Sequence, residues 1–373
     1  MIRWPRPPRR PFAYGLLALL VASIAMLVAV GRGGWSITAL PHVDSTTKLG
    51  AAARGVDPDF HTVHPGAYDG QFYWGIAVDP LANGAVHTAF DKASYRYGHP
   101  LYGWLGWLFS AGRPDAVPAA LAAVGLASLL AAATIAAALG RRRGRSGWEG
   151  LFVALNPGLI SAATLDLAEP LAAALLLGAF AAHTRGRRVY LWICLALLPL
   201  AKEPLILVVF TVGLWELIQR RGRRAALVAS AVLPALGWWA YLRIHLGAWF
   251  TSGDTALGAP FAGWRAALSN AGSRTHGSAD RHVAAAAILV ALLALFAVAF
   301  ARALMRPSPL SFSYVALALV AACLAPNATL AFTTALRNTA FLLVLVPFVT
   351  GLPRLLPVTR EATGSPESGP GVR

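Results

Sequence analysis

The chain has 373 residues, of which 57% are hydrophobic and only 13% are charged. Soluble domains carry roughly 45–50% apolar and about 25% charged residues, so the composition excludes an ordinary water-soluble protein. Lys and Arg outnumber Asp and Glu by 32 to 16. Basic cytoplasmic loops account for such an excess in a membrane protein, so we expect membrane lipids as partners and no nucleic acid.

The first long apolar run covers residues 13–31 and follows four arginines within residues 1–12. The run is longer than the apolar part of a secretory signal, and no small-residue cleavage site follows it. We therefore predict a basic cytoplasmic tail over 1–12 and an uncleaved first transmembrane helix.

Ten further apolar runs follow along the chain. They are residues 99–111, 116–139, 148–163, 167–183, 189–201, 204–218, 225–245, 283–301, 310–331 and 338–352. As a helix, the run 99–111 is only roughly 20 Å long, and a bilayer core is roughly 30 Å thick. We predict that it is half-inserted, which leaves about ten spanning helices (9–11).

Basic clusters at 141–145, 185–188 and 220–224 set the predicted orientation, because basic loops stay in the cytoplasm. Twelve of the 16 acidic residues then fall on the outer face, where we expect any chemistry. The predicted organisation is an all-α integral membrane protein with one polytopic domain over 13–356. Its two long outer loops are 32–115 and 246–282, and a tail over 357–373, rich in Pro, Gly and Ser, is predicted to be disordered in the cytoplasm.

The first outer loop contains an acidic residue followed by glycine and three aromatic residues. The string is Tyr68-Asp69-Gly70-Gln71-Phe72-Tyr73-Trp74-Gly75-Ile76-Ala77. One interpretation is an interfacial aromatic belt in which Asp69 caps a short helix. The other is a catalytic carboxylate at a cavity on the membrane edge, with the aromatic side chains binding a sugar.

This string resembles the W-D-G-x-[WF]-Y-x-x-I-A pattern of PIG-V-like mannosyltransferases, which are multi-spanning glycosyltransferases of the GT-C type. In that family a motif F-P-L-Y-P follows a few dozen residues later. Here His99-Pro100-Leu101-Tyr102-Gly103 stands at the corresponding place. The detailed resemblance covers about 35 residues, and Tyr68 and Gly103 differ from the family pattern.

The resemblance implies a GT-C fold and an enzyme that takes a sugar from a polyprenyl-phosphate donor. The acceptor would be a hydroxyl of a cell-envelope glycopolymer or glycolipid on the outer face of the plasma membrane, and hexosyl or mannosyl transfer would invert the anomeric centre. Asp69 would be the general base, with Tyr68, Gln71 and Tyr73 binding substrate. No cofactor is implied, and a divalent metal is not indicated.

A lipid phosphate leaves as an anion, so cations should stabilise it. Lys202, between the runs 189–201 and 204–218, is our first candidate, because a charge beside a membrane-embedded segment is costly and often functional. The alternatives are that Lys202 only reaches to water or pairs with Glu203. Arg96, His99 and Arg337 are further phosphate candidates.

Several other acids remain open to two interpretations. Asp166 and Glu169 fit a helix capping box, but they would also lie beside the proposed site. Asp57 and Asp59 form a D-x-D pair of the kind that binds a metal–sugar–nucleotide, and Asp44 is a second candidate for the base.

Two other functions remain possible for this sequence, a lipid or solute transporter and a non-catalytic assembly subunit of the envelope. A transporter needs polar groups near the bilayer midplane. In this sequence the acids gather at one rim of the apolar runs, which favours interfacial chemistry.

Overall fold

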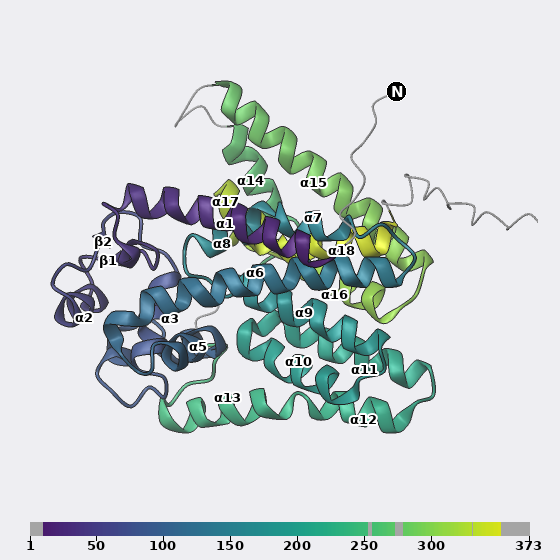
Figure 1. Cartoon of the computed structure of the whole chain (residues 1–373), viewed down its shortest axis with the longest axis horizontal. Helices are drawn as coiled ribbons and strands as arrows, with labels where there is room; N and C mark the ends of the chain where they lie inside the picture. Colours follow the sequence, from purple (N-terminus) through teal and green to yellow (C-terminus); the bar gives the residue numbers. More distant parts are fainter. Residues whose placement is uncertain (1–9, 253–255, 273–278, 330, 352–373) are drawn as a thin grey trace, which may run out of the picture.

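The computed structural model describes residues 10–252, 256–272, 279–329 and 331–351 (Figure 1). The described part is mainly helical. Its strand pairing is limited to one short parallel pair, β1 (Val43–Asp44) and β2 (Thr62–Val63), and an isolated bridge between Leu257 and Leu324, which confirms the all-α prediction for these residues. The tail 357–373 and most of the tail 1–12 lie outside the described residues.

The chain begins with the long helix α1 (Phe12–Arg32). Seven short helices, four α and three 3-10 (η), then precede the long helix α6 (Val117–Arg142): η1 (Ile37–Ala39), α2 (Lys48–Val56), α3 (Gly70–Val78), η2 (Val86–Ala89), α4 (Ala93–Arg96), α5 (Leu101–Phe109) and η3 (Pro114–Ala116). The elements after α6 are α7 (Glu149–Ala154), α8 (Pro157–Ala163), α9 (Glu169–Thr184), α10 (Arg188–Ala201), η4 (Glu203–Leu205), α11 (Ile206–Ile218), α12 (Gly222–Ser230), α13 (Leu233–His245), α14 (Ala262–Gly272), α15 (Ala279–Met305), α16 (Pro309–Ala322), η5 (Pro326–Ala328), α17 (Phe332–Asn338) and α18 (Ala340–Thr350).

Among the described residues, four segments are long and apolar enough to cross a membrane: Phe12–Arg32, Pro114–Arg142, Gly222–His245 and Val283–Met305. The pair α17–α18, bent by 52°, makes a fifth if it counts as one span. Helices α9, α10 and α16 are apolar but shorter. The described helices are therefore compatible with a multi-pass membrane protein.

Several of the predicted runs form shorter helices than their length suggests. The run 310–331, for example, gives α16, which ends at Ala322. The run 148–163 breaks into α7 and α8 at Asn156, whose Oδ1 accepts hydrogen bonds from the amides of Gly158 (3.0 Å) and Leu159 (3.2 Å). Pro157 at the first position of α8 favours the same start. Helix α5 has nine residues and is roughly 14 Å long, too short to cross a bilayer.

Helix α6 lies at the centre of the packing and contacts α1, α5, α7 and α9. Its fully buried face is made of small residues, among them Ala132, Ala133, Ala136 and Ala137. On the facing side of α1, a Cβ atom at Gly15 would overlap Thr134 Oγ1. Small residues let membrane helices approach closely, and here they hold α1 against α6.

The two ends of the helix bundle differ in the residues that they carry. The elements between α1 and α6 gather at one end of these long helices, at the left of Figure 1, and we call this the site end. The turns that follow α6, α9 and α11 carry the basic clusters, and we call this part the basic end. Arg142 and Arg185 are close enough there to interact electrostatically, and His183 of α9 contacts Glu216 of α11.

Candidate functional site

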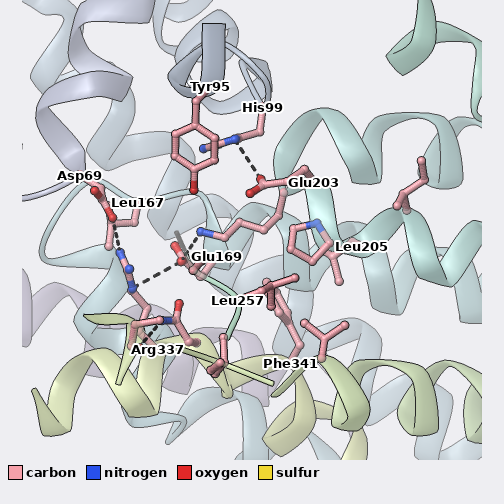
Figure 2. Close-up of a pocket in the computed structure, with 18 of the residues that line it drawn as sticks. Asp69, Tyr95, His99, Leu167, Glu169, Glu203, Leu205, Leu257, Arg337 and Phe341 are labelled. Atoms are coloured by element: carbon pink, nitrogen blue, oxygen red, sulfur yellow. Dashed lines mark hydrogen bonds and ion pairs between the residues drawn. The ribbon is translucent and has the colours of Figure 1, made fainter. Parts of the chain in front are cut away.

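A cavity of about 560 Å³ lies at the site end, and we call it the site cavity (Figure 2). Its wall comes from α3, the α4–α5 connection, the start of α9, the α10–α11 connection, α16, α17 and α18. Seven of the ten predicted site residues line it: Asp69, Tyr73, Arg96, His99, Glu169, Lys202 and Glu203. Arg337, a predicted phosphate candidate, lines it as well.

Asp69 occupies the N-cap position of α3, but its side chain makes no capping hydrogen bond. The capping interpretation therefore does not describe what this carboxylate does. The next residue, Gly70, must be glycine for steric reasons. A Cβ atom there would overlap the carbonyl oxygen of Leu165 and lie 2.9 Å from the carbonyl oxygen of Pro41. Glycine lets the start of α3 approach the α8–α9 connection, and this places Asp69 beside the start of α9.

The two carboxylate oxygens of Asp69 are paired with two different guanidinium groups. Oδ1 accepts from Arg96 Nη1 at 3.1 Å, and Oδ2 accepts from Arg337 Nη1 at 3.0 Å. Burial raises the pKa of the Asp69 carboxyl, but the positive charges of Arg337 and Arg96 outweigh burial and hold the pKa below its ordinary value. Asp69 is thus ionised and strongly paired in this state of the protein.

Each of these arginines is also held by a second acidic residue and by an aromatic ring. Arg96 donates from Nε and Nη2 to the two oxygens of Asp91, at 3.1 and 3.2 Å, and its guanidinium lies 3.7 Å from the centre of the Phe72 ring. Such a bidentate pair over an aromatic face fixes the guanidinium plane. Asp91 is a residue that the sequence analysis missed, because nothing distinguishes it from the other acids of the loop.

Arg337 is only 9% exposed and belongs to α17, far along the chain from Asp69. Its Nε lies 3.7 Å from Glu169 Oε1, and its guanidinium lies 5.0 Å from the centre of the Tyr68 ring. The Tyr68 hydroxyl in turn lies 3.2 Å from Thr334 Oγ1. Tyr68 therefore supports Arg337 from behind and does not line the cavity.

Lys202 contacts Glu169 rather than its neighbour Glu203, with 2.9 Å between Nζ and Oε1. Glu203 pairs instead with His99, whose Nδ1 lies 2.9 Å from Oε2 (Figure 2). Burial raises the pKa of Glu203, but the neighbouring charges of His99 and Lys202 lower it to about 2. The site cavity thus contains a set of carboxylates that are all paired with basic side chains.

Two further predicted substrate residues lie outside the wall of the cavity. The Gln71 side chain accepts a hydrogen bond from the backbone amide of Asp44 at 3.2 Å, so it holds the outer segment together. Asp166 is fully buried, with φ of 49°, and burial raises its pKa. The capping-box interpretation is wrong for this acid, because the N-cap of α9 is Ala168.

The remaining acids of the first loop make local contacts. Asp57 Oδ1 accepts from the amide of Asp59 at 2.9 Å, and neither residue lines the site cavity. Asp44 lies 3.3 Å from His64 and also stays outside the wall. Across the described residues, no three His, Cys, Asp or Glu side chains lie together as a metal ion requires.

Most of the remaining cavity wall is apolar and comes from segments that contain no polar motif, although Lys92, Tyr95, Thr251, Asn327, Thr334 and Asn338 also line it. The apolar part includes Leu205, Leu257, Leu317, Val320 and Phe341. Figure 2 shows Leu205, Leu257 and Phe341 on one side of the cavity and Asp69 on the other. The sequence analysis missed this surface, because nothing in the apolar runs of α16 and α18 separates residues that face a cavity from residues that face lipid.

Models of known families, curated proteins and solved structures were compared with this chain, and none matches it.

Proposed function

We propose that the chain is an integral-membrane glycosyltransferase that moves a sugar from a polyprenyl-phosphate donor to a hydroxyl of an envelope glycan or lipid. One observation carries this proposal: a single cavity joins a cluster of cations and carboxylates to an apolar wall. The proposal includes the GT-C arrangement with about ten crossings, and an active face on the outside of the plasma membrane.

The two parts of the cavity suit the two parts of such a donor. A prenyl chain buries apolar surface against residues such as Leu317 and Phe341, at roughly 25 cal/mol per Å² removed from water. A phosphodiester carries one negative charge. Among the described residues, five basic side chains line the cavity (Lys92, Arg96, His99, Lys202 and Arg337) against the three carboxylates of Asp69, Glu169 and Glu203. This excess of basic groups favours an anionic ligand.

The reaction needs one proton acceptor and a stabilised leaving group. The acceptor oxygen forms a bond to C1 of the sugar while the bond from C1 to the phosphate oxygen breaks, and that electron pair leaves on the phosphate. The acceptor proton passes to the carboxylate of Asp69, which acts as general base. The cations offset the second negative charge that develops on the departing prenyl phosphate.

The alternatives are a lipid or solute transporter and an assembly subunit without catalytic activity. A transporter moves charge along a path through the midplane. Three charged groups of this cavity belong to helix starts and connections, namely Asp69 before α3, Glu169 at the start of α9 and Lys202 after α10. Arg96 and Arg337 lie in the last turns of the short helices α4 and α17. This placement favours chemistry at one membrane face over passage across it.

The test uses the full chain purified in nanodiscs with radiolabelled sugars on a short prenyl phosphate and a hydroxylated envelope glycan as acceptor. We expect sugar to appear on the acceptor and free prenyl phosphate to form in equal amounts. Asp69→Asn is the inactive control. Absence of transfer from every sugar tried, together with donor flux across proteoliposomes, contradicts the proposal and favours a transporter.

A further inference from the structure

We propose that Arg96 and Arg337 form the subsite for the donor's phosphodiester, and that Asp69 occupies this subsite while the cavity is empty. The inference rests on the proposed function and specifies which cations hold the phosphate. It also connects donor binding to the activation of the base.

The geometry of the two arginines is the first argument. Arg96 is held by its bidentate pair with Asp91, and Arg337 by the charge of Glu169, 3.7 Å from its Nε, and by the ring of Tyr68. Each arginine directs Nη1 at Asp69. Because the anchors do not involve Asp69, both Nη1 groups stay converged when Asp69 moves away. Two converging guanidinium donors are the arrangement that binds a pair of anionic oxygens.

The second argument is the shape of the Asp69 carboxylate, which is the resident anion of the subsite. Asp69 offers two oxygens on one carbon, and each accepts from one arginine at 3.0–3.1 Å. A phosphodiester offers two non-bridging oxygens on one phosphorus with the same single charge. A site that holds the first anion is therefore built to hold the second.

Lys202 is a weaker candidate for the same role, although the sequence favours it. Its ammonium lies 2.9 Å from Glu169 Oε1, and that carboxylate is almost completely buried. Moving Lys202 to a ligand would leave Glu169 buried beside Arg337 alone, and a buried charge that loses a partner is costly. Arg96 and Arg337, by contrast, keep an anionic partner when the donor phosphate replaces the Asp69 carboxylate.

A functional consequence follows for Asp69. While it is paired with two guanidinium groups, the carboxylate has a low affinity for a proton and is a poor base. Once the donor phosphate takes Nη1 of both arginines, Asp69 loses these partners and gains basicity in the same step. Donor binding thus precedes proton abstraction, and the acceptor hydroxyl is not activated in an enzyme without donor.

The experiment measures binding of citronellyl ethyl phosphate, a prenyl phosphodiester, to the full chain in dodecyl maltoside. The neutral citronellyl diethyl phosphate is the control for the lipid part alone. Asp69→Asn and Asp69→Ala remove the resident anion, so each should bind the diester roughly tenfold more tightly while losing transfer. Arg96→Lys and Arg337→Lys should each bind it roughly tenfold more weakly, because lysine lacks the second donor.

Three further measurements separate this assignment from others. Asp91→Asn should weaken binding although Asp91 does not line the cavity, because it orients Arg96. Arg113→Lys is the matched control, since this exposed arginine pairs with Asp115 outside the wall and should bind normally. Inorganic phosphate should need at least roughly tenfold higher concentrations than the prenyl diester, because it has no apolar chain to bury. Phosphatidylglycerol should also need higher concentrations, because the cavity would have to hold two acyl chains in place of one prenyl chain.

Weaker or unchanged binding in both Asp69 variants overturns the inference, as does a larger loss in Lys202→Met than in either arginine variant. Equally tight binding of phosphatidylglycerol also overturns it. A chain that transfers sugar but shows one of these results keeps the proposed function and loses the inference. A chain that binds the diester as expected but transfers no sugar loses the proposed function alone.

Discussion

Acids paired with arginine occur at both ends of this molecule, but in different surroundings. At the site end, Asp69 and Glu169 line a cavity and share cations with each other. At the basic end, Glu149 is fully buried, and its Oε1 lies 3.4 Å from Arg145 Nη1, which also donates to the carbonyl oxygen of Pro347 at 2.7 Å. The two clusters contain the same chemical groups.

The difference lies in the space beside each carboxylate. A Cβ atom at Gly140 would overlap Glu149 Oε2, so this acid packs directly against the backbone of α6. The Arg145 contact joins the α6–α7 connection to α18, which makes the pair a structural clamp. Asp69 is 40% exposed as a side chain and faces the open volume of the site cavity. Charge pairing alone does not mark a functional site; pairing beside an open volume does.

The largest effect is expected for a substitution in the site cavity, at Asp69. Asp69→Asn is nearly isosteric and removes the basic oxygen, so sugar transfer should fall by roughly 10²–10⁴. The melting temperature should fall only modestly, because Arg96 and Arg337 each keep a second acidic neighbour, Asp91 and Glu169. Transfer rates and melting curves of the purified variant provide the measurement.

Asp57→Asn and Asp59→Asn are the controls for this change, since both acids lie in the same loop outside the cavity wall. They should keep wild-type rates. If these two variants were inactive and Asp69→Asn remained active, the D-x-D pair would replace Asp69 as the reactive group.

The second prediction concerns the clamp at the basic end. Arg145→Met leaves Glu149 buried without its partner, which should cost about 3–5 kcal/mol of stability. Transfer per folded molecule should stay unchanged at low temperature. Thermal unfolding of this variant against Arg187→Met, an exposed arginine, tests the effect. If Arg145→Met were stable but had low turnover, the Arg145–Glu149 pair would serve activity and not stability. The two ends would then not differ as described above.

The third prediction concerns Lys202, which pairs with Glu169 within the cavity. Lys202→Met keeps the apolar stem and removes the charge, so turnover should fall roughly tenfold while the fold survives. Lys202→Arg should retain part of the activity. The rate is measured against donor concentration, and unchanged kinetics in the methionine variant would remove Lys202 from the reaction.

The smallest expected effect is the dependence of stability on pH. The pKa of Asp69 is lowered in the folded protein, so its pairs stabilise the fold above the ordinary carboxyl pKa, near 4. This contribution is lost as the pH falls below 4 through the lowered value, and it is constant between pH 5 and 8. Melting temperatures between pH 8 and 3 should therefore decline less steeply for Asp69→Asn than for the wild type.

The sequence predicts the all-helical composition and the acid of the first loop, because apolar runs and a local motif are properties of neighbouring residues. It does not predict which cations meet that acid. Arg337 lies 268 residues from Asp69, and their contact depends on the packing of α17 against α8. Because the two residues are so far apart along the chain, the sequence does not predict that they pair, although it names both Asp69 and Arg337 as candidates.

Asp166 and Glu169 show the same limit over a short distance. The two residues are three positions apart, and the sequence suggests a single capping-box motif. In the structure, Glu169 lines the cavity while Asp166 is buried outside its wall. The positive φ of Asp166 turns the chain just before α9 and separates the two side chains. A backbone conformation of this kind carries no signal in residue type, since aspartate adopts it only occasionally.

The anion-binding pair joins residue 96 to residue 337, so the site forms from nearly the whole length of the chain. A nascent chain that has inserted only its first half holds Asp69 and Arg96 but lacks the second arginine. Domains form from the N-terminus during synthesis, and contacts between distant residues form late. Under the proposed function, a partly synthesised chain would therefore expose no competent centre to lipid donors, and activity would begin only when the C-terminal helices have docked.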